Sequence, residues 1–365
     1  MIQLKDLCQK ASSNIAQKDL EGHEGQYPIY GASGLIGYVD FYKQENPYVA
    51  VVKDGAGIGR VMCLPEKSSV IGTMQYILPN EGVNVHYLAF AMEHMNLAKY
   101  FSGATIPHIY FKDYGKEKLL ERTEKEQKSI AEILSKMDSL ISLRKQQIAK
   151  LDELVKARFV EMFGDFEFNP KEFPVYHLCE LCDVGSSKRI YQEEQSISGI
   201  PFLKVADLNE LIDTGKYSCS TFIPLERYEQ LLHKELTPTE NDILITSRGT
   251  LGKCYIVQSD DEFYFQDGMI SWLSNFSPKV SSIYISYLFA QPYIQKQIES
   301  LQAGSTVAYL SIAMLKKINV ILPPKKLQDD FATFVERVDQ QKQTVQQSLE
   351  KLELMKKALM QEYFG

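Results

Sequence analysis

Apolar residues recur in alternating steps of four and three along the segment that precedes Gly164. Seven of the eight positions in this series are apolar, and the positions between them carry Lys, Glu, Gln and Ser. A heptad pattern of this kind predicts a long helix whose apolar stripe packs on another helix. The eight positions are Ile130, Leu134, Met137, Ile141, Arg144, Ile148, Leu151 and Val155.

A weaker copy of this pattern precedes the last residue, Gly365. Pro323 and Pro324 cannot lie inside a helix, so they fix where the second helix starts, and a glycine after the last apolar turn suits its end. Each helix should have about 35 residues and measure about 50 Å. We expect the two helices to pair antiparallel; the alternative is that each packs only on its own globular part. The second series is Phe331, Val335, Val338, Lys342, Val345, Leu349, Leu352 and Lys356.

The two helical segments belong to an internal repeat. Residues 103–106 match residues 304–307, and the offset of 201 positions holds without a gap to the end of the chain. Upstream the register drifts, as loops of unequal length would cause, but the motif at Leu4–Cys8 returns at Leu178–Cys182. The chain therefore contains two copies of one repeat unit, roughly 1–164 and 165–365.

The part of each unit before its helix contains short β-rich runs, and each of these runs ends in a glycine-rich turn. The predicted fold is α+β: two mixed α/β domains separated by two long antiparallel coiled-coil helices, with a pseudo-two-fold repeat. The expected boundaries are 1–118 and 165–322 for the domains, and 119–164 and 323–365 for the helix regions. Strands are expected at 48–52, 61–63, 242–246 and 255–257, and short helices at 86–95 and 286–299.

The composition indicates the class of protein and its cellular compartment. The chain is 44% apolar and 24% charged, which is typical of a folded soluble protein, and it has no apolar run long enough to span a membrane. The first residues lack a secretory signal, so we expect a cytoplasmic protein whose six cysteines are reduced. A net charge of −7 argues mildly against a nucleic-acid binder that acts alone, although partner subunits could supply basic surface.

No motif in the chain carries catalytic chemistry. Glycines 55, 57 and 59 lack the spacing of a dinucleotide-binding loop, and a tight hairpin turn explains them better. Cys179 and Cys182 lack a second pair of zinc ligands at finger spacing, so buried thiols are expected and no metal site. The residues therefore favour a reader or a scaffold over an enzyme.

This arrangement resembles the specificity subunit of Type I restriction-modification systems, over essentially the whole chain. Both the layout of two variable parts followed by related long helices and several local phrases are similar to that family. One departure is that 119–123 replaces the Leu-Pro-Pro that the second unit keeps before its helix, which leaves the start of the first helix open. The similar phrases are 27–38, 51–59, 243–253, 304–310 and 321–328.

The resemblance implies a non-catalytic protein that binds double-stranded DNA. Each domain would read one half of a bipartite site, and a 50 Å helical spacer would span about 15 base pairs. Two methyltransferase subunits carrying S-adenosylmethionine would dock on the chain, and two motor-nuclease subunits using ATP and Mg²⁺ would join for cleavage. No cofactor is expected in the chain itself.

Candidate residues follow from the groups that DNA contacts require: cationic side chains, hydroxyls and glycine-rich turns. The candidate DNA contacts are Ser33, Lys53, Arg60, Thr105, Ser186, Ser187, Lys188, Arg189, Lys204, Ser247, Arg248 and Lys253. The residues expected to pair the helices are Ile130, Leu134, Met137, Ile141, Ile148, Leu151, Phe331, Val335, Val338, Val345, Leu349 and Leu352.

Two other functions remain open on the residues alone. A coiled-coil scaffold could use the front parts to bind protein or sugar, but it would not need two divergent readers. A fused nuclease or methyltransferase would need a cofactor loop or a methylase signature, and neither is found in the sequence.

Overall fold

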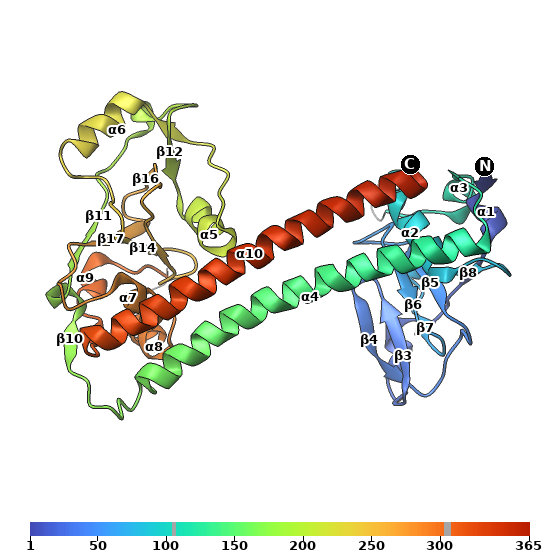
Figure 1. The fold of residues 1–365 in the computed structure, drawn as a ribbon, viewed down its shortest axis with the longest axis horizontal. Helices are drawn as coiled ribbons and strands as arrows, with labels where there is room; N and C mark the ends of the chain where they lie inside the picture. Colours follow the sequence, from blue (N-terminus) through green and yellow to red (C-terminus); the bar gives the residue numbers. More distant parts are fainter. Residues whose placement is uncertain (104–106, 303–307) are drawn as a thin grey trace. The chain divides into compact units, whose positions relative to one another are not determined.

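The computed structural model describes residues 1–103, 107–302 and 308–365. The chain divides into two compact units, one made of Met1–Ile148 with Gln343–Gly365 and the other of Ala149–Lys342. Each unit contains one globular domain and a stretch of both long helices (Figure 1). The first domain is the part of the chain before the first long helix, and the second domain lies between the two long helices.

The described residues of the first domain form three small sheets. A four-stranded antiparallel sheet has the order β2-β8-β5-β6, and a three-stranded sheet has the order β4-β3-β7 with β3 and β7 parallel. All five residues of β5 are buried, because its run of β-branched and aromatic side chains is covered on both faces. The strands are β1 Ile2–Gln3, β2 Cys8–Ser12, β3 Tyr27–Gly31, β4 Gly34–Val39, β5 Tyr48–Val52, β6 Val61–Leu64, β7 Ser69–Val70, β8 Met74–Pro79 and β9 Lys118–Leu119.

Short helices complete this domain. Helix α2 packs against β5 and β6, and it is capped by the Asn84 side chain, which accepts a hydrogen bond from the Tyr87 amide at 3.0 Å. The pair β1–β9 closes the domain next to the first long helix. The helices are α1 Leu4–Leu7, α2 Val85–His94 and α3 Phe111–Tyr114, with 3₁₀ turns at Gln17–Leu20 and Leu97–Tyr100.

The second domain repeats this topology. Its four-stranded antiparallel sheet has the order β11-β17-β14-β15, and its three-stranded sheet β13-β12-β16 again has one parallel pair. The pair β10–β18 corresponds to β1–β9, so the predicted internal repeat is confirmed at the level of topology. The strands are β10 Val175–His177, β11 Asp183–Ser186, β12 Ile200–Leu203, β13 Phe222–Ile223, β14 Ile243–Thr246, β15 Cys254–Ile256, β16 Tyr264–Phe265, β17 Ile270–Ser274 and β18 Asn319–Ile321.

The helices of the second domain differ from the prediction, which expected neither α5 nor α6. A single helix was expected over 286–299, but the chain forms two helices there because Pro292 starts a new one at its first position. The helices are α5 Val205–Thr214, α6 Leu225–Leu232, α7 Ser282–Phe289, α8 Pro292–Leu301 and α9 Ile312–Leu315, with 3₁₀ turns at Leu178–Glu180 and Gln192–Glu194.

The two long helices are α4, Glu124–Phe163, and α10, Lys325–Phe364, with 40 residues each. They are longer than the predicted 35 residues. The start of α4 is fixed without prolines, because the Thr123 hydroxyl accepts from the Glu126 amide while the Glu126 carboxylate accepts from the Thr123 amide at 2.8 Å. Gly164 ends α4 in the left-handed conformation with φ 86°.

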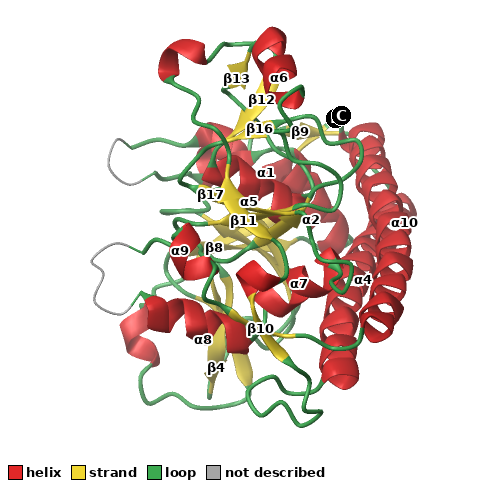
Figure 2. Cartoon of the chain, turned by 90° about the vertical axis from the view of Figure 1, so that its left-hand side faces the viewer, coloured by secondary structure: helices red, strands yellow, loops and turns green. Residues whose placement is uncertain are grey.

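Within each unit α4 and α10 pair antiparallel, and Figure 2 shows them side by side. In the unit that contains the first domain, Lys145 pairs with Glu353 at 2.9 Å and Asp138 with Lys356 at 2.7 Å. In the other unit, Lys342 pairs with Asp152 at 2.6 Å. As α4 advances along the chain its partners on α10 recede, which is the order of an antiparallel pair.

The predicted helix-pairing residues are buried or half-buried along this seam. The ends of the stripe also enter the domain cores: Ile130 and Leu134 join the core of the first domain, and Phe331, Val335 and Val338 join that of the second. The helices therefore pair with each other and also pack on the domains. The half-buried members are Ile141, Ile148, Leu151 and Leu352. Met137, Val345 and Leu349 are buried. Among the described residues, no helix is long and apolar enough to cross a membrane.

Candidate nucleic-acid interface

In the first domain a glycine-rich loop follows β5 and is tied to the segment before α3. The Ile109 amide donates to the Lys53 carbonyl at 3.0 Å, and the Gly55 amide donates to the Pro107 carbonyl at 3.1 Å. Gly59 has φ 81°, and a Cβ there would lie 2.5 Å from the Ala98 amide nitrogen, so only glycine fits this approach. The loop conformation is thus fixed by backbone contacts.

Charged and aromatic side chains gather on this loop. The Asp54 carboxylate binds the His108 ring nitrogen at 2.6 Å and the Lys53 ammonium at 3.1 Å. The His108 ring stacks on Tyr110 with centroids 6.4 Å apart, and the Lys112 ammonium lies 5.3 Å from the Tyr110 ring centre. Tyr110 is half exposed. Cations beside an exposed aromatic ring are groups that contact nucleic-acid backbones and bases.

Two further predicted residues, Arg60 and Ser33, lie near each other. The Arg60 guanidinium donates to the Ala32 carbonyl at 2.7 Å, in the turn between β3 and β4. The neighbouring Ser33 is exposed in that turn. Arg60 and Ser33 therefore form one polar surface. Thr105 lies outside the described residues.

The second domain builds the matching loop after β14. The Leu310 amide donates to the Ser247 carbonyl at 3.0 Å, and Ile109, which lies 201 positions before Leu310, makes the same contact with Lys53. Arg248 and Tyr309 form the bridge at the position of Asp54 and His108, and the guanidinium carbon lies 6.0 Å from the Tyr309 ring centre. Arg248 is exposed. The two loops share backbone contacts and differ in side chains.

The basic cluster after β11 lies against this loop. The Ser247 amide donates to the Met269 carbonyl at 2.9 Å, and the Gly268 amide donates to the Ser186 hydroxyl at 3.2 Å. Arg189 pairs with Asp267 at 3.0 Å and is exposed, as is Lys188. The turn around Met269 thus links Arg248 to the predicted segment 186–189.

Some predicted contacts have other roles in the structure. Ser187 and Ser247 are buried; the Ser187 hydroxyl donates to the Phe265 carbonyl at 2.7 Å, and that of Ser247 bonds to Ser271 at 2.7 Å. These bonds argue against the prediction that both hydroxyls contact DNA. Ser186 likewise donates to the Ile270 carbonyl at 2.9 Å. These serines hold the loop that presents the arginines.

Two predicted lysines lie apart from the arginine cluster. The Lys253 ammonium binds both oxygens of Asp213 at 2.7 and 2.9 Å. It lines a cavity of about 640 Å³ whose other walls include Asp152 and Lys342 of the helix pair, so it faces the helices. Lys204 is exposed at the start of α5, where its amide donates to Asp207 at 2.8 Å.

Sequence reasoning missed His108, Tyr110 and Tyr309. The offset of 201 positions could have found the match between His108 and Tyr309, because it holds through this segment. Nothing local in the sequence marks either residue as the partner of a loop more than 50 positions away.

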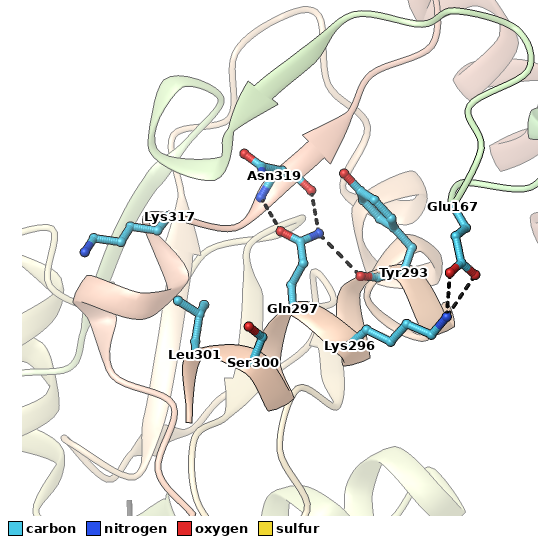
Figure 3. A pocket seen from close by; sticks show the side chains of 8 residues that line it. All are labelled: Glu167, Tyr293, Lys296, Gln297, Ser300, Leu301, Lys317 and Asn319. Carbon is cyan, nitrogen blue, oxygen red and sulfur yellow. Dashed lines mark hydrogen bonds and ion pairs between the residues drawn. The ribbon is translucent and has the colours of Figure 1, made fainter. Parts of the chain in front are cut away.

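A second cavity in the same unit, of about 430 Å³, lies along α8 (Figure 3). Several of its polar groups bind one another. Lys296 pairs with Glu167 at 2.8 Å, and the Gln297 side chain accepts from the Asn319 amide at 2.8 Å while donating to the Asn319 carbonyl at 3.1 Å. These pairs join α8 to β18 and to the segment after α4, so a structural role accounts for them.

The cysteines are free thiols in the structure. Cys182 is buried, and burial raises its pKa to about 12, as it does for Cys8 at the matching place in the first domain. Cys179 is exposed, so the prediction that both thiols of the pair are buried was wrong for this residue. It lies in the short 3₁₀ turn at Leu178–Glu180. No group of residues within the described ranges could hold a metal ion.

Known proteins show the same organisation. The model of the family described as Type I restriction modification DNA specificity domain matches residues 1–153 and 170–354. The type I restriction enzyme MjaVIII specificity subunit of Methanocaldococcus jannaschii is 25% identical over 392 residues, covering 98% of this chain and 89% of that protein.

Two solved structures share the fold. The S subunit of a Type-I restriction-modification system from M. genitalium aligns with a TM-score of 0.66 at 17% identity, over 100% of this chain and 95% of that one. A chain from a study of complex assembly and conformational transition in the type I R-M system aligns with a TM-score of 0.54 at 12% identity, over 99% of this chain and 96% of that one.

Proposed function

We infer that this chain, which belongs to the family of Type I restriction modification DNA specificity domains, reads a bipartite DNA sequence with one half-site for each domain. One observation carries the proposal. The same loop is built twice with the same backbone contact, yet Asp54 and His108 in the first domain are replaced by Arg248 and Tyr309 in the second. Two domains that share one loop structure but carry different side chains are suited to a DNA site with two different halves.

The side chains on the two loops match the groups that DNA presents. Arg248 is exposed and is the kind of side chain that binds guanine edges in the major groove with two hydrogen bonds. Lys53, Lys188 and Arg189 suit phosphate contacts, which position the protein without reading sequence. The overall charge of −7 favours basic partner surfaces that share the phosphate contacts.

The long helices would set the unspecified gap between the half-sites. A helix of 40 residues measures about 60 Å, which is about 18 base pairs at 3.4 Å each. Exposed leucines on α4, at 140, 143 and 154, support docking of partner proteins on the same helices. We propose two methyltransferase subunits with S-adenosylmethionine as those partners, and two motor-nuclease subunits with ATP and Mg²⁺. The chain itself would be non-catalytic and hold no cofactor.

Methylation sequencing of the host genome, with this gene intact and deleted, tests the proposal. We expect the deletion to remove one split motif made of two short specified halves around a fixed gap. An unchanged methylome, with the methyltransferase shown to be expressed, would contradict a role in DNA recognition and favour the scaffold. Binding of S-adenosylmethionine by the purified chain alone would contradict its non-catalytic role.

A further inference from the structure

Gln127 occupies the first turns of α4 but bonds away from its own helix. Its side-chain oxygen accepts from the Asn84 amide at 3.0 Å, and its side-chain nitrogen donates to the Arg122 carbonyl at 3.0 Å. Asn84 is the residue that caps α2, the helix on the sheet of the first domain. Only 5% of Gln127 is exposed. One buried amide thus joins the start of the long helix to the start of a domain helix.

Gln328 makes the same connection in the second domain. Its oxygen accepts from the amide of Ser281, which precedes α7, at 2.9 Å. Its nitrogen donates to the Pro323 carbonyl at 2.8 Å and to the Lys279 carbonyl at 3.0 Å. None of Gln328 is exposed. The two glutamines stand 201 positions apart and make matching bonds to matching elements.

Starting the helices does not require these bonds. Helix α4 already has its capping box at Thr123 and Glu126, and α10 starts behind Pro323 and Pro324. The residues before the two helices differ, since one copy has prolines and the other does not, yet the glutamine contact is the same in both. A buried amide with both its oxygen and its nitrogen bonded fixes two segments in one geometry, because any shift leaves a polar group unpaired.

We propose that Gln127 and Gln328 are positioning residues that fix the angle between each long helix and its recognition domain, and thereby set the gap length that the protein accepts. The inference rests on the proposed function, because it takes the two domains as readers of two half-sites. The glutamines would act through the domains and touch no DNA themselves. Loosening the contact between either long helix and its domain would let that domain reach half-sites at neighbouring spacings.

The test uses the chain assembled with its methyltransferase subunits. Duplexes carry the same two half-sites, identified by methylation sequencing, with the native gap or a gap one base pair shorter or longer. Gln127→Met and Gln328→Met keep the length of the side chain and remove its hydrogen bonds. We expect each to lower the preference for the native gap at least about tenfold, because Gln127 makes two buried hydrogen bonds and Gln328 makes three. Gln347→Met, at an exposed position of α10, should leave the preference unchanged.

A milder variant covers the case in which methionine prevents folding. Gln127→Asn keeps both the acceptor and the donor on a side chain that is one methylene shorter, so it should retain more of the native preference than Gln127→Met. A uniform fall in methylation at every gap would overturn the inference, since it would mean that the glutamines only stabilise the chain. A wild-type complex without any gap preference would instead overturn the proposed function.

Discussion

In the first domain the loop after β5 places Asp54 against His108, whereas the loop after β14 in the second places Arg248 against Tyr309. The backbone bond beneath them is unchanged: an amide donates to the carbonyl at the end of the strand at 3.0 Å in both loops. Because backbone groups hold the loop, the exposed side chains can vary without loss of the fold. The different side chains on the two loops show how one architecture can read two sequences.

The same comparison at the seam between helices and domains shows where the copies differ in packing. Phe159 of α4 is fully buried in the second unit, where its ring lies 5.2 Å from that of Phe331 and 5.8 Å from that of Tyr284. The position 201 residues later is Met360, in the core of the first unit. An aromatic cluster thus joins helix to domain in one unit, where the other uses a flexible thioether.

Truncating Phe159 and Met360 should have the largest effects on stability, and the two effects should differ. Phe159→Ala should lower the free energy of unfolding by about 3–5 kcal/mol, and Met360→Ala by about 2–3 kcal/mol, because the aromatic ring loses more contacts and leaves a larger cavity. Urea unfolding of the two variants measures the difference. An equal loss in both would show that the aromatic cluster adds nothing beyond apolar burial.

Arg248→Ala should have the next largest effect. The variant loses the exposed guanidinium of the second loop, so the assembled complex should bind its DNA more weakly by about 1–3 kcal/mol and accept other bases at one position of one half-site. Methylation of a library randomised at both halves measures this. Lys234→Ala, at an exposed position of the same domain, is the control. Relaxation in both halves would contradict the assignment of one domain to one half-site.

The sequence was sufficient for the regular parts of this fold and insufficient for the sites. The heptad steps and the offset of 201 positions predicted both long helices and the repeat, because these patterns are local or periodic. The burial of Ser187 and Ser247 could not be predicted. The hydroxyl of Ser187 bonds to a residue 78 positions away, and that of Ser247 to one 24 positions away. Polar residues near a turn look alike in sequence, whether their partner is water, DNA or a distant carbonyl.

The contacts just before β9 in the first domain and just before β18 in the second, which we call the closing joints, differ in charge. In the first domain Lys99 pairs with Glu117 at 2.5 Å, and Tyr100 donates a hydrogen bond to the same carboxylate. At the position 201 residues after Glu117 the second domain has a buried Ile318. The first domain therefore has a titratable carboxylate here, whereas the second has an apolar side chain at the matching position.

Glu117→Gln should have the smallest effect, and its pH dependence distinguishes the two joints. Hydrogen bonds from Lys99 and from Tyr100 lower the pKa of Glu117 below its usual value. An acid with a lowered folded pKa stabilises the native state above its unfolded pKa, and this contribution is lost as pH falls through the folded pKa. The variant should lose about 0.5 kcal/mol at pH 7, because the ion pair is partly exposed and screened, and progressively less as the pH falls through the folded pKa.

Urea unfolding at a series of pH values from 7 downward measures the loss, with the exposed Glu121→Gln as control. A loss that stays constant over the whole series would mean that Glu117 acts through packing and not through its charge. A loss that vanishes in acid would show that the two copies of one joint are held by different forces: charge in the first domain, and apolar burial of Ile318 in the second.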